Sequence, residues 1–532
     1  MNRKEAEVQL KKIFGFNHFH DEQWTTIKHV LHGDRVLLIE RTGFGKSLCY
    51  QFPAAVLPGI TIIFSPLIAL MRDQVQKLNS LGIDARCLNS EQNSLENSKI
   101  LKDAKDGKIK ILYIAPERMD NVAWMKTVKQ LNLSMVVVDE AHCISVWGHD
   151  FRPAFRRIIE LVKTLPVGIP VLATTATATK TVEEDIIQQM GGNAKSIRGK
   201  LMRDNLQLQV IQVGCQDDKL IWLAQHLEKL EGSGIIYTGT RKDVTRYTNW
   251  LKQNDIPCAG YHAGLSPVER VKIEKGLMNN DWKCVISTNA LGMGIDKPDI
   301  RFIIHTQIPQ SPIHYYQEIG RAGRDGDTGR VILLYHFTDV KLPQMFINFS
   351  KPAVNSYMKV IQLLQEKRFT EQELCKKTNI FDAAMRSIKA DLIEQGLIAE
   401  KQVGQKKYLQ IITGAPPMDF RMIDKLREIR MAELDEMVAY AETRESRMKF
   451  LCRYLGDEED NLFKNCDNSG VKPLTLMPDL RLESVLRKFY GDMQEEEMVE
   501  TAIAKNTLGI KMKGIERIKR KVVDSNLENP FG

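Results

Sequence analysis

Two adjacent carboxylates, Asp139 and Glu140, directly follow a short apolar run at residues 135–138. Such a run predicts a buried strand of a parallel sheet, and open α/β sheets bind their ligands beyond the carboxyl ends of the strands. Carboxylates can hold a metal–nucleotide complex, and aromatic rings can stack on bases. The adjacency of both kinds of side chain predicts a motor that couples ATP chemistry to a nucleic acid. The aromatic and polar segment that follows at once contains Trp147, His149, Phe151 and Arg152.

A glycine-rich segment forms the second part of the predicted nucleotide site. Residues 40–47 read Glu-Arg-Thr-Gly-Phe-Gly-Lys-Ser, after one predicted strand and before an apolar run that is typical of a helix. Glycines in such a phosphate loop let backbone N–H groups contact phosphates. Lys46 would contact the β- and γ-phosphates, and Ser47 would hold Mg²⁺. The other expected nucleotide contacts in this loop are Thr42, Gly43 and Gly45. Glu40 stands where the strict pattern has glycine.

Hydrolysis needs groups that act on the metal, on the attacking water and on the developing phosphoryl charge. We expect Asp139 to coordinate Mg²⁺ through water and Glu140 to orient or deprotonate the attacking water. Arg321 and Arg324 are three residues apart and would lie on one helix face. From a second domain, one of them could contact the γ-phosphate. Gln317, which opens the same segment, is a further catalytic candidate.

Bulk properties limit the class of protein. The chain has 532 residues, a net charge of +8 and nine cysteines without paired spacing. The scattered cysteines favour reduced intracellular thiols. No apolar run approaches the roughly 18 residues that a membrane span needs, and the polar amino-terminus lacks the apolar core of a signal peptide. We therefore expect a cytoplasmic protein without membrane contact, or a nuclear one if the source is eukaryotic.

The order of elements predicts an α/β fold with two tandem parallel-sheet domains. Short β-branched runs alternate with amphipathic stretches up to about residue 340, in two sets that part near 199–206. A helical pattern follows, and Thr370 with Glu373 forms a capping box at the start of one helix. The expected units are domain 1 (1–200, ATP-binding), domain 2 (201–345), a winged-helix-like unit (350–415), a helical unit (416–475) and a basic helical tail (476–532).

From residue 14 to about 340 the chain resembles a superfamily 2 helicase of the RecQ family. The segments that carry the resemblance are 14–23, 65–74, 115–118, 139–155, 175–177, 261–265, 288–299 and 317–326. The resemblance implies two RecA-like domains, ATP and Mg²⁺ as cofactors, and 3′→5′ translocation on single-stranded DNA with duplex separation. It implies that Gln23 recognises the purine and that Gly292 and Asp296 contact the nucleotide. Arg41 and Phe44 replace the usual proline and glycine of the phosphate loop.

The expected partners are single-stranded DNA and 3′-tailed duplexes. A motor on single strands needs stacking faces and contacts to the phosphate backbone. Trp147 and Phe151 would supply the faces, and His149 and Arg152 belong to the same loop; the alternative is that these aromatic residues are core. Ser65, Thr175 and Thr288 could contact the backbone, although hydroxyl side chains at strand ends are often caps. Protein partners in a repair or defence complex are left open.

Four positions near the carboxyl-terminal end correspond to the zinc ligands of the family. They hold Ser446, Phe463, Cys466 and Ser469, so that one thiol remains. Structural zinc needs four ligands, usually Cys or His, and we predict that zinc is absent. In the preceding unit, Tyr408 or the turn at 402–407 would form a wing that either separates strands or only contacts DNA backbone or protein.

The leading hypothesis is an ATP-dependent 3′→5′ DNA helicase. A second hypothesis is a DNA-binding translocase or a subunit of a larger complex, with weak hydrolysis because of the substitutions at 40–44. A third is an RNA motor.

Overall fold

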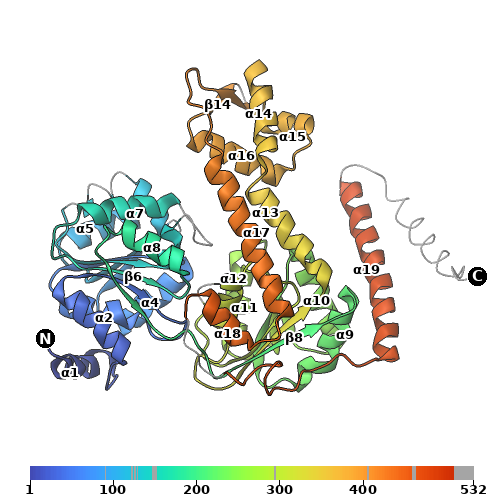
Figure 1. Cartoon of the computed structure of the whole chain (residues 1–532), viewed down its shortest axis with the longest axis horizontal. Helices are drawn as coiled ribbons and strands as arrows, with labels where there is room; N and C mark the ends of the chain where they lie inside the picture. Colours follow the sequence, from blue (N-terminus) through green and yellow to red (C-terminus); the bar gives the residue numbers. More distant parts are fainter. Residues whose placement is uncertain are drawn as a thin grey trace, which may run out of the picture.

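The computed structural model describes residues 1–507 except 90–91, 122–123, 125–126, 129, 146–152, 293–294, 404–405 and 458–462. Trp147, His149, Phe151 and Arg152, for which DNA contacts were expected, lie outside the described residues. Two parallel sheets covered by helices form the body of the protein, and a mainly helical region follows them (Figure 1). The predicted fold class is confirmed.

The first sheet has seven strands in the order β3-β4-β2-β5-β6-β1-β7, and all neighbouring strands are parallel. Strand β2 is buried along its whole length because helices cover both faces of the sheet. The strands are β1 (Arg35–Ile39), β2 (Ile60–Phe64), β3 (Ala85–Leu88), β4 (Ile111–Ile114), β5 (Leu133–Asp139), β6 (Val171–Thr175) and β7 (Lys195–Arg198). The helices are α1 (Arg3–Phe14), α2 (Asp21–His32), α3 (Leu48–Val56), α4 (Ile68–Ser80), α5 (Ser94–Lys105), α7 (Pro153–Thr164) and α8 (Lys180–Gln189), with short 3₁₀ turns η1 (Pro116–Asp120) and η2 (Ala141–Ile144).

The second sheet has six parallel strands in the order β10-β11-β9-β12-β13-β8. Its strands are β8 (Leu206–Gln212), β9 (Ser233–Tyr237), β10 (Cys258–Tyr261), β11 (Cys284–Ser287), β12 (Ile300–His305) and β13 (Gly329–Tyr335). Its helices are α9 (Gln216–His226), α10 (Arg241–Gln253), α11 (Pro267–Met278) and α12 (Pro312–Ile319), with 3₁₀ turns η3 (Leu227–Lys229) and η4 (Phe337–Val340). Residues 199–205 connect the two sheets and are called the hinge below.

The region after the second sheet begins with α13 (Lys341–Ser350) and a small separate unit. Three helices and an antiparallel hairpin follow in the order expected of a winged helix: α14 (Val354–Glu366), α15 (Glu371–Thr378), α16 (Asp382–Glu394), β14 (Ile398–Val403) and β15 (Lys406–Ile411). The capping box at Thr370 and Glu373 is formed. Helix α17 (Arg421–Glu442) runs from this unit to the second domain, where α18 (Arg447–Tyr454) follows (Figure 1).

The segment from Leu474 to Phe489 packs on the second domain, a contact that the predicted basic helical tail (476–532) did not include. Helix α19 (Leu480–Thr507) lies beside α9 (Figure 1). Phe489 is buried and meets the ring of Trp250 edge-on, with centroids 5.4 Å apart. The indole of Trp222 donates to the carbonyl oxygen of Leu474 over 2.6 Å. The first part of this helix is therefore a component of the domain core.

The helical region also covers the exposed edge of the second sheet. Leu208 of β8 donates its N–H to the carbonyl of Asn465 (3.0 Å) and accepts from the N–H of Asp467 (3.1 Å). Arg447 forms a bidentate ion pair with Asp467 at 2.5 and 2.9 Å. The pairing occupies an edge that would otherwise be open to other strands. Among the helices that the structure describes, none combines the length and apolar character needed to cross a membrane.

Candidate active site

A cavity of about 300 Å³ lies between the two sheet domains. Both domains contribute to its wall, so that side chains distant in sequence face one another. The lining residues are Thr42, Gly43, Gly45, Lys46, Ser47, Leu67, Leu70, Gln74, Asp139, Glu140 and Ala176 from the first domain, and Ile295, Asp296, Gln317, Arg321 and Arg324 from the second.

The phosphate loop follows β1 and turns sharply at two glycines. Gly43 and Gly45 have φ values of 85° and 90°, a region that side chains other than glycine rarely adopt. Lys46 folds back, and its Nζ donates to the carbonyl oxygens of Glu40 (2.8 Å) and Arg41 (3.1 Å). Burial lowers the pKa of Lys46, and the charges of Glu140 and Asp139 oppose this effect.

Asp139 ends β5 and is held by hydroxyl groups of neighbouring strands. Thr174 donates to one carboxylate oxygen over 2.7 Å, and Ser65 donates to the other over 3.4 Å. Burial raises the pKa of the Asp139 carboxyl, whereas the bond from Thr174 and the charge of Lys46 lower it. Ser47 and Asp139 offer oxygen atoms to the same cavity, and oxygen is the ligand that Mg²⁺ prefers. Ser47 and Asp139 therefore fit as ligands of the expected Mg²⁺.

Glu140 has a left-handed backbone, with φ 52° and ψ 50°. This conformation costs a non-glycine residue about 1–3 kcal/mol and is often retained at functional sites. It places the Glu140 carboxylate in the cavity wall, 3.3 Å from Nδ1 of His142. His142 in turn lies 3.0 Å from the hydroxyl of Thr175. A carboxylate oriented in this way can hold a water molecule against a phosphate.

The two arginines lie in a turn and not on a helix face, which corrects the prediction. Helix α12 ends at Ile319, before both side chains, and Gly320 is its carboxyl-terminal cap. The turn that follows still directs Arg321 and Arg324 into the cavity. Arg324 donates to Asp296 over 2.9 Å, and its aliphatic part lies next to Gly43 of the phosphate loop.

Two polar contacts bridge the domains beside the arginines. The side-chain amide of Gln317 donates to the hydroxyl of Thr177 over 3.0 Å. Lys77 and Asp296 form an ion pair of 3.2 Å. Sequence reasoning missed both partners in the first domain. Thr177 belongs to the segment 175–177, on which the family resemblance rests. No sequence pattern distinguishes Lys77 from the other exposed lysines.

Some expected site residues lie elsewhere. Gln23 is buried and donates to the carbonyl of Phe44 (3.2 Å), so it holds the phosphate loop and does not line the cavity. Gly292 lies near Arg321 but is also outside the lining. Ser65 and Thr175 are buried, and their hydroxyls face Asp139 and His142 and not the surface. Gln74, Leu67 and Leu70 line the cavity without having been singled out.

Thr288 lies apart from Ser65 and Thr175, in a second cavity of about 580 Å³. This cavity is at the carboxyl ends of the strands of the second sheet and is also lined by Arg241 and His305. His305 is buried, and its Nε2 lies 2.8 Å from a carboxylate oxygen of Glu318 on α12.

The four positions assigned to zinc hold two hydroxyls, a phenyl ring and one thiol. The thiol of Cys466 lies 3.0 Å from the hydroxyl of Ser469, which donates to the carbonyl of Phe463. Phe463 and Cys466 are buried in one apolar cluster with Cys452. Throughout the described part of the chain there is no group of three or more His, Cys, Asp or Glu side chains that could hold a metal.

Three family patterns match the chain in order. They are the DEAD/DEAH box helicase at residues 20–185, the helicase conserved C-terminal domain at 218–326 and the RecQ zinc-binding region at 406–469. The last match covers the four positions at which zinc ligands were expected, Ser446, Phe463, Cys466 and Ser469.

Two curated relatives come from Bacillus subtilis (strain 168). The ATP-dependent DNA helicase RecQ is 37% identical over 372 residues, which cover 70% of this chain and 63% of that protein. The probable ATP-dependent DNA helicase RecS is 38% identical over 360 residues, which cover 67% of this chain and 72% of that protein. The chain thus spans less than two thirds of the length of that RecQ.

Solved structures of helicases share the fold at low identity. Dbp5 of S. cerevisiae, bound to RNA and ADP BeF3, has a TM-score of 0.51 and 19% identity, and the match covers 64% of this chain and 90% of that one. The helicase Lhr of Mycobacterium smegmatis, bound to ssDNA and AMP-PNP, has a TM-score of 0.52 and 17% identity, with 78% and 60% covered. These likenesses concern the fold. Together with the relatives, the order of the family patterns shows that the chain belongs to the RecQ family of ATP-dependent DNA helicases.

Proposed function

We propose that the protein is an ATP- and Mg²⁺-dependent DNA helicase of RecQ type that moves 3′→5′ along single-stranded DNA. The observation that supports this best is the cavity that joins Lys46, Asp139 and Glu140 to Arg321 and Arg324. Because Arg321 and Arg324 come from the second domain, hydrolysis depends on closure of the two domains around the nucleotide. A cycle of closure and opening is the motion that a translocase needs.

Each group has a defined task in this proposal. Lys46 would exchange its bonds to loop carbonyls for a phosphate oxygen, and Ser47 and Asp139 would hold Mg²⁺. The bound metal would neutralise charge on the phosphates. Glu140 orients the water, and Arg321 or Arg324 stabilises the charge that develops on the γ-phosphate. Gln317 and Asp296 keep the turn that carries the arginines against the first domain.

The test is ATP hydrolysis and strand separation by the wild type and Lys46→Ala, on duplexes with a 3′ or a 5′ tail. We expect separation of the 3′-tailed duplex only, lost with hydrolysis in Lys46→Ala. Lys28→Ala, at an exposed position of α2, is the control and should behave like the wild type. Hydrolysis without separation would contradict the helicase and favour the translocase. Equal stimulation by single-stranded RNA would contradict DNA preference.

We place single-stranded DNA across the second cavity, in contact with Thr288 and Arg241. An exposed arginine beside a hydroxyl suits a phosphate backbone, which is gripped without reading sequence. Arg241→Ala should weaken binding of an oligonucleotide. It should also lower the slope of the binding constant against salt concentration by the equivalent of about one phosphate contact. An unchanged salt dependence would place the strand elsewhere.

We propose that the segment with Trp147, His149, Phe151 and Arg152 senses DNA. Trp147→Ala should lower the stimulation of hydrolysis by DNA and spare the basal rate. If the basal rate collapsed as well, the segment would have a structural role.

We also propose that the protein folds without zinc. A phenyl ring, two hydroxyls and one thiol cannot replace four anionic or imidazole ligands, and the buried Phe463 stabilises the same region by apolar packing. Elemental analysis of purified protein should find well under one zinc per chain, and a chelator should leave the thermal midpoint unchanged. One zinc per chain after dialysis would refute this.

A further inference from the structure

Glu40 and Arg41, the first two residues of the phosphate loop (40–47), both contact the hinge between the domains. Arg41 donates from its guanidinium to the carbonyl oxygen of Met202 over 2.9 Å. The carboxylate of Glu40 is buried against the backbone of Gly199, where a β-carbon would lie 1.6 Å from Oε1. Both residues depart from the expected sequence of such a loop, and neither lines the cavity. Their side chains face the hinge and not the cavity.

The hinge is also held from the side of the second domain. Leu201 donates its N–H to a carboxylate oxygen of Asp457 (2.8 Å) and accepts from the hydroxyl of Tyr316 (2.5 Å). Tyr316 lies on α12, the helix that leads to the arginine turn. Both backbone groups of Leu201 are thus bonded, one to α12 and one to the segment that follows α18.

Arg203 completes the connection from the hinge to the arginine turn. Its guanidinium is buried and donates to the carbonyl oxygens of Gly320 (3.3 Å), Ala322 (2.8 Å) and Gly323 (2.8 Å). These are the carbonyls on either side of Arg321. These three bonds tie the turn to the hinge on both sides of Arg321.

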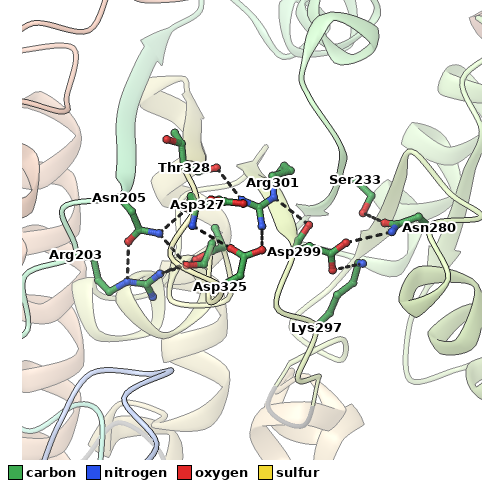
Figure 2. Close-up of polar contacts among 12 residues, drawn as sticks. Arg203, Asn205, Ser233, Asn280, Lys297, Asp299, Arg301, Asp325, Asp327 and Thr328 are labelled. Atoms are coloured by element: carbon green, nitrogen blue, oxygen red, sulfur yellow. Dashed lines mark hydrogen bonds and ion pairs between the residues drawn. The ribbon is translucent and has the colours of Figure 1, made fainter. Parts of the chain in front are cut away.

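Asn205 and two acidic residues support the far end of the same turn. Figure 2 shows Arg203 and Asn205 side by side, reaching toward the segment that contains Asp325 and Asp327. Asn205 donates to the carbonyl oxygens of Gly323 (2.8 Å) and Asp327 (2.7 Å), and Asp325 pairs with Arg301 of β12. The turn is therefore rigid with respect to the hinge and to the second sheet.

We propose that Glu40 and Arg41 are positioning residues that couple the phosphate loop to the arginine turn through the hinge. Rearrangement of the loop around a nucleotide shifts Met202 through Arg41 and Gly199 through Glu40. Arg203 transmits the shift to the turn, so that Arg321 and Arg324 approach the γ-phosphate. The proposal rests on the proposed function and adds the route between the two halves of the site.

Steady-state hydrolysis with saturating DNA tests the route. Arg41→Ala should lower kcat about tenfold, as expected for one charge-assisted hydrogen bond, with the KM for ATP changed less than twofold. Arg41→Lys, which keeps one donor, should recover most of the rate. Arg86→Ala, at an exposed position of β3, is the control. A raised KM with unchanged kcat would make Arg41 a nucleotide-binding residue and overturn the proposal, as would no effect at all.

A double-mutant cycle separates a serial route from independent contacts. If the route is serial, the double variant with Arg41→Ala and Arg203→Ala hydrolyses ATP no more slowly than the slower single variant. Independent effects on the rate would multiply. Thermal unfolding identifies a variant that fails to fold; in that case Gly199→Ala, combined with Glu40→Ala to make room, replaces it. Gly199→Ala and Glu40→Ala should each be slow, and the pair should be no slower than the slower single variant; effects that multiply would overturn the contact. A wild type without hydrolysis would refute the proposed function instead.

Discussion

The buried carboxyl of Glu40 leads to a measurable pH dependence of stability. Its side chain is 2% exposed, and burial raises its pKa to about 7, assisted by the charge of Glu22 and opposed by Lys46 and Arg41. In the unfolded chain the pKa is that of an ordinary glutamate, about 4.3. Between these values the folded state binds more protons than the unfolded state. The free energy of unfolding should therefore fall as the pH rises from about 4.5 through about 7.

The magnitude follows from the two pKa values. A difference of about 2.7 pKa units corresponds to about 4 kcal/mol at full ionisation, of which about 2–3 kcal/mol should be lost between pH 5 and pH 8. Glu40→Gln keeps the shape of the side chain and removes its charge. The variant should be more stable than the wild type at pH 8 by about this amount, with a much smaller difference at pH 5.

The assay is urea unfolding followed by intrinsic fluorescence at pH 5, 6, 7 and 8. The difference between the two proteins is the relevant quantity, because all other titrating groups are shared. The charge of Glu22 raises the pKa of Glu40, although Glu22 does not lie against Gly199. Glu22→Gln is therefore a second comparison, and it should change the slope of the unfolding free energy against pH less than Glu40→Gln does. Parallel curves for wild type and Glu40→Gln over this range would refute the reasoning, because the carboxyl would then titrate equally in both states.

Three further predictions concern the site and the core. Glu140→Gln should lower the rate of hydrolysis about 10²–10⁴-fold while ATP affinity measured by calorimetry is retained, and loss of affinity would show that the carboxylate only shapes the cavity. Phe489→Ala should destabilise the second domain by about 3–5 kcal/mol in urea unfolding, whereas Leu480→Ala, 81% exposed, should change little; equal effects would mean that α19 is not part of the core. Asp339→Ala leaves the buried ammonium of Lys219, now 2.6 Å from that carboxylate, without its partner. Asp339→Ala should cost about 3–5 kcal/mol, whereas Asp106→Ala, which removes an exposed ion pair with Lys108, should cost under 1 kcal/mol. Similar values for the two variants would contradict this difference.

Local patterns were sufficient for the parts of the molecule that depend on backbone geometry. Alternating apolar runs predicted both parallel sheets, because strands buried on two faces must be apolar along their length. The glycines at 43 and 45 and the carboxylate at 139 indicated the nucleotide site, since a phosphate loop requires those residue types in that order. The capping box at Thr370 was predicted for the same reason, because its hydrogen bonds join residues three apart.

Contacts between distant segments were decided only by the tertiary structure. The sequence pattern predicted Arg321 on a helix, whereas α12 ends at Ile319, two residues before it, and Arg203 donates to carbonyl oxygens of the turn that follows. It treated the segment after residue 476 as a tail, although Phe489 is buried against Trp250. A side-chain hydrogen bond or an apolar contact across more than a hundred residues leaves no periodic signal, because it depends on where the domains lie. The sequence alone therefore determined which chemistry the protein carries, and the packing of the hinge and the carboxyl-terminal helices decided how its two halves are joined.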